Sequence, residues 1–159
     1  MSMRVETRGD MEVVARFDAA PAGVHASIFR AMARLGIDLL GYVVENLSGS
    51  VLKRRTGNLV RAQVMKGPNV NGGRTDVAVG FNRQTAPYGV YHEKGVPHPW
   101  IIEAKRAKAL KFQIGGKTFF RKRVMHPGLP ERSFLRSALA RIAPRVGPEL
   151  TAAIAEGSK

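Results

Sequence analysis

The chain has 159 residues, 44% of them hydrophobic, and carries a formal net charge of +14 at pH 7. This length suits a single domain that buries about 70% of its unfolded surface. The absence of cysteine excludes a disulfide framework and a thiolate metal site. No stretch approaches the roughly 20 apolar residues of a membrane span, and the acidic N-terminus is unlike a signal peptide, so we expect a cytosolic protein where it is made.

The positive charge is concentrated in the middle of the chain. Residues 51–145 carry twenty basic and four acidic side chains, whereas residues 1–50 carry five basic and six acidic ones. This imbalance predicts contact with nucleic acid or an acidic protein surface, and the alternative is a well-solvated basic exterior. No motif for sequence-specific DNA recognition is present. The candidate contact residues are Lys53, Arg54, Arg55, Arg121, Lys122, Arg123 and Arg132.

The first part of the chain predicts a strand followed by a long helix. Residues 3–17 alternate loosely between apolar and charged side chains around an Arg8-Gly9-Asp10 turn, which predicts a strand or hairpin. This segment is either an ordinary sheet strand or an arm that pairs with a neighbouring subunit. Apolar residues at steps of three and four then predict an amphipathic helix over residues 21–47, ended by Ser48-Gly49-Ser50.

A short helix and a strand are expected next. The hydroxyl of Thr56 suits a helix N-cap, so we predict a short helix over residues 57–63. Residues 67–73 read as a loop. The alternation of apolar residues over 77–81 predicts a strand with one buried face.

Residues 88–95 predict a second short helix, because Tyr88 and Tyr91 are a helical three apart and Gly95 suits a terminator. His92-Glu93 followed by His98 suggests a metal site. However, the spacing is not the H-E-x-x-H of metal-binding helices, and prolines flank His98. We therefore expect no metal here. Instead, we expect His92 and Glu93 to hydrogen-bond backbone groups and fix the following loop.

A basic stretch over residues 101–109 predicts a turn of helix or an extended link. Alternation on both sides of Gly115-Gly116 then predicts a hairpin of residues 110–114 and 118–125. The register of this hairpin depends on the length of its loop.

A two-residue loop pairs Phe112 with Phe119, whereas a three-residue loop pairs Phe112 with Phe120. We favour the three-residue loop, because the shorter one places Lys117 and Arg121 beside core residues.

The last predicted element is a helix that follows a turn. Pro127-Gly128 is a turn signal, and Pro130 suits the first helical turn, where its missing N–H would have no partner. Phe134 and Leu135 begin an apolar stripe that we expect to clamp this helix to the sheet and the first helix. Pro144 disfavours helical geometry at the preceding residue, so we expect a break within residues 143–148.

Together these elements predict an α+β fold. A long N-terminal amphipathic helix and a C-terminal helix pack on a small, mainly antiparallel sheet that includes the Gly-Gly hairpin. We expect one domain over residues 1–159, with an N-terminal strand or arm (1–20), a core (21–143) and a C-terminal helical tail (144–159). No nucleophile–base pair, carboxylate dyad, phosphate loop or metal cluster stands out, so we expect neither catalysis nor a cofactor.

Several motifs follow one another in a characteristic order over residues 24–142. The long helix and a basic cluster precede Thr56-Gly57-Asn58-Leu59, and a one-faced strand precedes Tyr88-x-x-Tyr91-His92-Glu93-x-Gly95. Ala107-Lys108-Ala109-Leu110-Lys111-Phe112, the Gly-Gly hairpin, His126-Pro127-Gly128 and Phe134-Leu135-x-x-Ala138-Leu139 complete the order. This order resembles the tail-completion, or head–tail joining, proteins of long-tailed bacteriophages. The signature residues are Gly57, Tyr88, Tyr91, His92, Glu93, Gly95, Pro127, Gly128, Phe134 and Leu135.

The chain departs from the family pattern in two places. Lys94 stands where an aromatic residue is common, and Pro144 and Pro148 interrupt a final helix that is often continuous in the family.

The resemblance implies a structural virion protein without catalytic residues. Such proteins form a homo-oligomeric ring, a hexamer or a ring of twelve copies, at the neck of the virion. Their partners are head connector or adaptor proteins on one side and tail tube or terminator proteins on the other, with genome DNA passing the lumen and no membrane. The protein would be found in the virion neck or tail, and in the host cytoplasm during assembly.

Two other functions remain open at this point. Within the same class, the chain is a tail terminator or a minor tail protein. In a different class, it is a basic nucleic-acid-binding module without sequence preference. Phe112, Phe119 and Phe120 would then stack on bases beside Lys111, Lys117 and Arg121.

Overall fold

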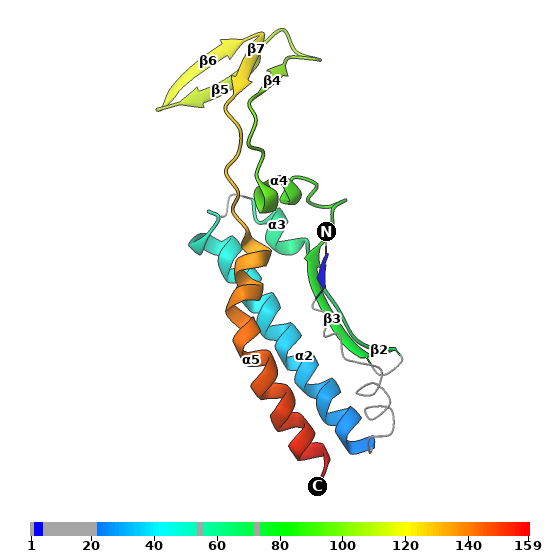
Figure 1. Cartoon of the computed structure of the whole chain (residues 1–159). Coiled ribbons are helices and arrows are strands. Elements are labelled where there is room, and N and C mark those ends of the chain that lie inside the picture. Colours follow the sequence, from blue (N-terminus) through cyan, green and yellow to red (C-terminus); the bar gives the residue numbers. More distant parts are fainter. Residues whose placement is uncertain (1, 5–21, 54–55, 72–73) are drawn as a thin grey trace.

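The computed structural model describes residues 2–4, 22–53, 56–71 and 74–159, and their fold is α+β, as predicted (Figure 1). Two long helices lie side by side, and a small antiparallel sheet packs on the first of them. The elements in order are β1 (Ser2–Arg4), α2 (Ala22–Glu45), η1 (Asn46–Ser50), α3 (Asn58–Arg61), β2 (Gln63–Asn71), β3 (Arg74–Phe81), α4 (Gly89–Lys94), β4 (Trp100–Glu103), β5 (Leu110–Ile114), β6 (Lys117–Arg121), β7 (Arg123–His126) and α5 (Phe134–Gly157).

Helix α2 confirms the long amphipathic helix. It begins at Ala22 and continues after Glu45 into the π-helical turn η1, where Gly49 leaves helical geometry. Buried residues at steps of three and four, such as Val24, Ile28 and Leu35, form the stripe expected for a helix packed on other elements.

The three-stranded sheet has the order β1-β3-β2 and is antiparallel throughout. Strand β3 buries Val77, Val79 and Phe81, which confirms the predicted one-faced strand. Of the predicted N-terminal strand, Ser2–Arg4 pairs with β3, and the Arg8-Gly9-Asp10 turn lies outside the described residues.

Strand β2 was not predicted. The helix expected over residues 57–63 ends at Arg61, and the expected loop over 67–73 is mostly strand. Gly57, in the left-handed conformation, precedes the helix, so Thr56 is not its N-cap, although the Thr56 hydroxyl accepts a long hydrogen bond of 3.4 Å from the Asn58 N–H. Pairing with β3 overrides the local turn signals, and a register irregularity between Lys66 and Asn69 accommodates them.

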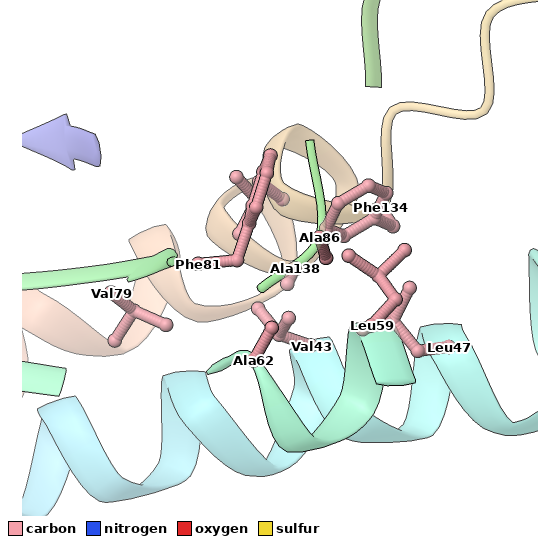
Figure 2. Packing of buried hydrophobic residues seen from close by; sticks show 10 residues of the cluster. Val43, Leu47, Leu59, Ala62, Val79, Phe81, Ala86, Phe134 and Ala138 are labelled. Atoms are coloured by element: carbon pink, nitrogen blue, oxygen red, sulfur yellow. The ribbon is translucent and has the colours of Figure 1, made fainter. Parts of the chain in front are cut away.

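Most of the core lies where the end of α2 meets α3, β3 and the start of α5 (Figure 2). Phe134 is fully buried there, and its ring centroid lies 5.9 Å from that of Phe81. Leu135 is also buried in this cluster. The predicted clamp of the last helix by Phe134 and Leu135 is therefore confirmed. A second, smaller cluster around Ile28 and Ala153 joins the other ends of the two helices.

Two predictions about the last helix, α5, are wrong. It begins at Phe134 rather than Pro130, after Ser133 adopts the left-handed region at φ 44°. It also runs without a break to Gly157, although Pro144 and Pro148 lie inside it. The residues 144–159 are thus not a separate tail.

Contacts with α2 on both sides of Pro144 explain the continuity of α5. Arg141 pairs with Glu45 at 2.7 Å, and Arg145 pairs with Asp38 at 2.8 Å. Both prolines are on the exposed face of the helix, where a missing hydrogen bond leaves a carbonyl group that water can reach.

Residues 96–129, which we call the arm, project beyond the rest of the molecule, which we call the body (Figure 1). Strand β4 pairs with β7, and β5 pairs with β6. The Ala104 N–H donates to the Lys122 carbonyl at 3.0 Å, so the two ladders follow one another in a single ribbon. Of the two alternatives for residues 101–109, the structure has no helical turn: the stretch begins in the extended strand β4 and continues as an irregular link.

The hairpin register differs from the favoured one. Gly115 and Gly116 form a two-residue turn with φ of 56° and 80°, and Phe112 pairs with Phe119, their ring centroids 5.8 Å apart. The three-residue loop would be preferred only if this face lay against a core. Neither face of the hairpin is buried, so Lys117 can share a face with Phe119 at little cost.

Within the described part of the chain, no helix is both long and apolar enough to cross a membrane.

Candidate functional site: the arm and its root

The arm leaves the body through two neighbouring backbone segments, which we call its root. Val96 and Leu129 exchange two hydrogen bonds, with N···O distances of 2.8 and 2.9 Å. Beside them, the Gly128 N–H donates to Nδ1 of His126 at 3.2 Å, and the His126 ring stacks on Trp100 with centroids 4.1 Å apart. The Val96–Leu129 hydrogen bonds and the Trp100–His126 stack join the two segments where the arm begins.

Two signature glycines determine the direction of the root. Gly95 and Gly128 have φ of 70° and 107°, which disfavour any residue with a Cβ. A Cβ on Gly95 would lie 2.7 Å from the Glu131 nitrogen, and one on Gly128 would lie 2.6 Å from the Val96 oxygen. Each glycine therefore allows one segment of the root to approach the other. The Pro127-Gly128 turn was predicted, but its partner across the root was not.

Glu93 anchors the root to the body. Its side chain is 3% exposed, and its carboxylate accepts hydrogen bonds from the Leu135 N–H at 2.8 Å and the Arg136 N–H at 3.0 Å. It thus caps the first turn of α5 from the neighbouring helix α4, where negative charge also suits the helix dipole. The His92 carbonyl accepts from the Arg132 N–H at 2.8 Å.

The hydrogen bonds of Glu93 confirm the expectation that this carboxylate satisfies backbone groups. Among the described residues, no group of three or more His, Asp or Glu side chains could hold a metal ion.

Asn46 was missed by sequence reasoning. Its buried amide donates to the Phe134 carbonyl at 2.8 Å and to the Ser137 hydroxyl at 3.0 Å, so it holds the same helix start from the α2 side. A polar residue at the end of an apolar stripe carries no local signal of a partner about 90 positions away.

A pocket of about 460 Å³ lies between η1, α3 and α4, the helix that precedes the root. Leu47, Leu52 and Leu59 are among the residues that give it an apolar lining. Four residues selected from the sequence also line it, namely Lys53, Gly57, Tyr88 and His92. Tyr91 is largely exposed and is not part of the lining.

The rings of His92 and Tyr88 are nearly perpendicular, with an interplanar angle of 88° and centroids 6.0 Å apart. Burial, together with the positive charge of Arg132, lowers the pKa of His92 below its ordinary value of 6.5. His92 is therefore neutral at physiological pH.

The candidate contact cations do not form one surface. Lys53 lies at the pocket, Arg132 follows the root, and Arg121, Lys122 and Arg123 lie on the arm where β6 meets β7. Arg54 and Arg55 lie outside the described residues.

No residue between Lys94 and Ser133 is buried, so the arm has no core of its own. Large apolar side chains are nevertheless present on it. Ile101 and Met125 form a cross-strand pair that is 53% and 61% exposed, and Ile114 and Phe120 are 64% and 58% exposed. An isolated two-stranded ladder is marginal in water. This arrangement is typical of a surface that contacts another molecule.

The arm is also strongly basic. It carries one carboxylate, Glu103, and eight exposed cations that form no ion pair with any described residue. These cations are Lys105, Arg106, Lys108, Lys111, Lys117, Arg121, Lys122 and Arg123. The sequence had indicated the last three as contacts, and Lys111 and Lys117 only in the alternative of a nucleic-acid-binding module. The other three, Lys105, Arg106 and Lys108, were not recognised as part of the same surface.

The site is therefore a projecting basic and apolar surface held at a defined root, beside a small apolar pocket. Comparison with known proteins returned no match: no family model, no curated protein and no solved structure is significantly similar to this chain.

Proposed function

We propose that this chain is a structural protein of a long-tailed bacteriophage, a tail-completion or head–tail joining subunit that forms a ring at the neck. The observation that carries the proposal is the arm, a ribbon without a single buried residue that projects from a body with its own core. Such a ribbon is marginal in water and gains stability when another molecule covers it, which suits a protein that works in an assembly.

The signature residues support the same function. Most of the residues on which the resemblance depends lie at or beside the root of the arm. Gly95, Pro127 and Gly128 form the root, Glu93 anchors it, and Gly57, Tyr88 and His92 line the adjacent pocket. Glu93, Gly95 and Gly128 therefore share a structural role, which is to hold the arm in one direction.

A ring also needs two different surfaces on each subunit, because a closed heterologous contact joins unlike patches. The arm offers the exposed pair Ile101 and Met125, and both of its ladders have only two strands in the described residues, which leaves edges free for pairing. The body offers Phe29 and Ile37 on the exposed face of α2.

The test is an assembly assay in which phage heads and tails made without this chain are mixed with the purified protein. We expect joined particles, with a ring of this chain between the head connector and the tail tube in electron micrographs. The double variant Ile101→Ser and Met125→Ser should remain folded and fail to join them, because it removes apolar contact area from the arm.

The matched control is Val70→Ser with Ile154→Ser, which removes two exposed apolar side chains from the body. It should join heads and tails like the parent protein. A ring found only at the end of the tail, without contact to the head connector, would identify a tail terminator instead. Particles that contain no ring of this chain would refute the proposal.

A further inference from the structure

The positive charge of the arm is concentrated between Lys105 and Arg123. From Lys105 to Arg123 there are eight cations, and no acidic residue lies between Glu103 and Glu131. All eight side chains are exposed. At this density the eight cations repel one another, so binding of a negatively charged partner would relieve an unfavourable electrostatic energy.

A second copy of the chain is a poor source of that negative charge. The remaining residues are also basic overall, since 19 residues of the arm hold eight of the 26 cations and the whole chain carries +14. Five carboxylates of the body are already paired with arginines of the same chain, and a sixth, Glu93, caps α5. A different, anionic molecule therefore supplies this charge, whereas the apolar pair of Ile101 and Met125 remains available to a second copy.

The distribution of the cations favours a polyanion with evenly spaced charges. Cross-strand partners share a face, so Lys117 and Arg121 lie on one face of the β5–β6 hairpin, and Lys111 lies on the other with Phe120. A two-stranded ribbon of this kind fits the major groove of duplex DNA, which has phosphates along both walls. An acidic patch on a protein would face only one side of the ribbon.

We infer that the arm binds duplex DNA through its phosphates, without sequence preference, and that the β5–β6 hairpin is the part that enters a groove. Lys111, Lys117 and Arg121 contact phosphates on both sides. Ile114 pairs with Lys117 beside the Gly115-Gly116 turn and therefore shares the face of Lys117 and Arg121. This inference does not depend on the neck function, since it concerns the isolated protein.

The experiment measures binding of the full chain to a fluorescent random-sequence duplex of about 25 base pairs, between about 50 and 200 mM salt. The arm variant is Lys111→Gln, Lys117→Gln and Arg121→Gln. The control variant is Arg34→Gln, Lys66→Gln and Lys159→Gln, which removes the same residue types and the same charge from exposed positions of the body. Thermal unfolding of both variants checks that they fold.

We expect the arm variant to bind at least about tenfold more weakly than the parent at the lower salt, with a salt slope shallower by about 2–3, because three phosphate contacts are lost. The control should bind within about threefold of the parent. Equal losses in both variants would show that only net charge matters and would overturn the inference. Absence of binding at low salt would also overturn it and would assign the arm to an acidic protein.

The outcome is separable from that of the assembly assay. A protein that binds DNA through the arm but forms no ring would support this inference and refute the neck function. A ring-forming protein that does not bind DNA would do the reverse.

Discussion

One carboxylate joins the two helices that flank the arm. Glu93 satisfies two N–H groups of α5 from a nearly fully buried position, so its removal leaves both without a partner. We expect Glu93→Ala to lower the free energy of unfolding by about 2–3 kcal/mol, as measured by urea denaturation. Glu131→Ala, which removes an exposed carboxylate paired with Arg136, should cost less than about 1 kcal/mol. Equal effects of the two substitutions would show that the cap contributes nothing.

The lowered pKa of His92 implies that the free energy of unfolding depends on pH. Its pKa is lower in the folded protein than the ordinary value of 6.5, so the unfolded chain binds the proton more readily. The contribution of neutral His92 to the free energy of unfolding is fully present above pH 6.5. It decreases as the pH falls below that value and is constant again below the pKa of His92 in the folded protein. Urea denaturation across this range should show the decrease in the parent and a smaller one in His92→Gln. Identical pH profiles would contradict the prediction.

The packing at the start of α5 can be tested by substituting Phe134. Because its ring is fully buried against Phe81, Phe134→Ala should cost about 3–5 kcal/mol through the cavity it leaves. Arg132→Ala, at an exposed position two residues earlier, should change the free energy of unfolding by no more than about 0.5 kcal/mol. Denaturant unfolding of both variants measures the difference. A Phe134→Ala variant with the same free energy of unfolding as the parent would mean that the surrounding side chains fill the cavity without loss of stability.

At the scale of elements, α5 is a continuous helix despite two internal prolines. Pro144 cannot donate a hydrogen bond to the Ala140 carbonyl, and the packing on α2 offsets that loss. Pro144→Ala should therefore raise the free energy of unfolding by about 1–3 kcal/mol. Pro130→Ala, outside the helix, should change it by about 0.5 kcal/mol or less. A destabilised Pro144→Ala variant in thermal unfolding would show that the helix needs the proline.

Elements with a local pattern were predictable from the sequence, and those that depend on distant partners were not. The stripe of α2, the alternation of β3 and the glycine after α4 are local, and each element was found where expected. Strand β2 and the continuity of α5 depend on pairing with β3 and packing on α2, which no local window contains. The predicted hairpin register, with a three-residue loop, is wrong because the hairpin has no core from which Lys117 and Arg121 must be kept away.

For the molecule as a whole, the body and the arm differ in what holds them together. No buried residue comes from the arm, so the core should not need it. Replacing residues 98–127 by a short Gly-Ser linker should leave the free energy of unfolding of the body within about 1 kcal/mol of the parent, since only the closed loop is shortened. Circular dichroism and thermal unfolding measure this. Aggregation or loss of helix would show that the arm contributes to the folding of the body.

The candidate site was predictable in its parts and not as a whole. Its basic character is evident from the charge of residues 51–145, and the glycines of the root follow from their turn patterns. The concentration of eight cations on one projecting ribbon is not evident, because it requires β4 to pair with β7 across about twenty residues. Glu93 was assigned to backbone groups, but the helix that it caps lies some 40 positions away.

The narrow root affects which insertions and deletions the sequence of this protein can tolerate. Both ends of the arm are held side by side by the hydrogen bonds between Val96 and Leu129, so everything beyond them is an insertion at a single point of the body. Insertions at such points alter neither the core nor its hydrogen bonds. The body can therefore keep its architecture while the ribbon is lengthened, shortened or exchanged for another, and binding properties can diverge much faster than the fold that carries them.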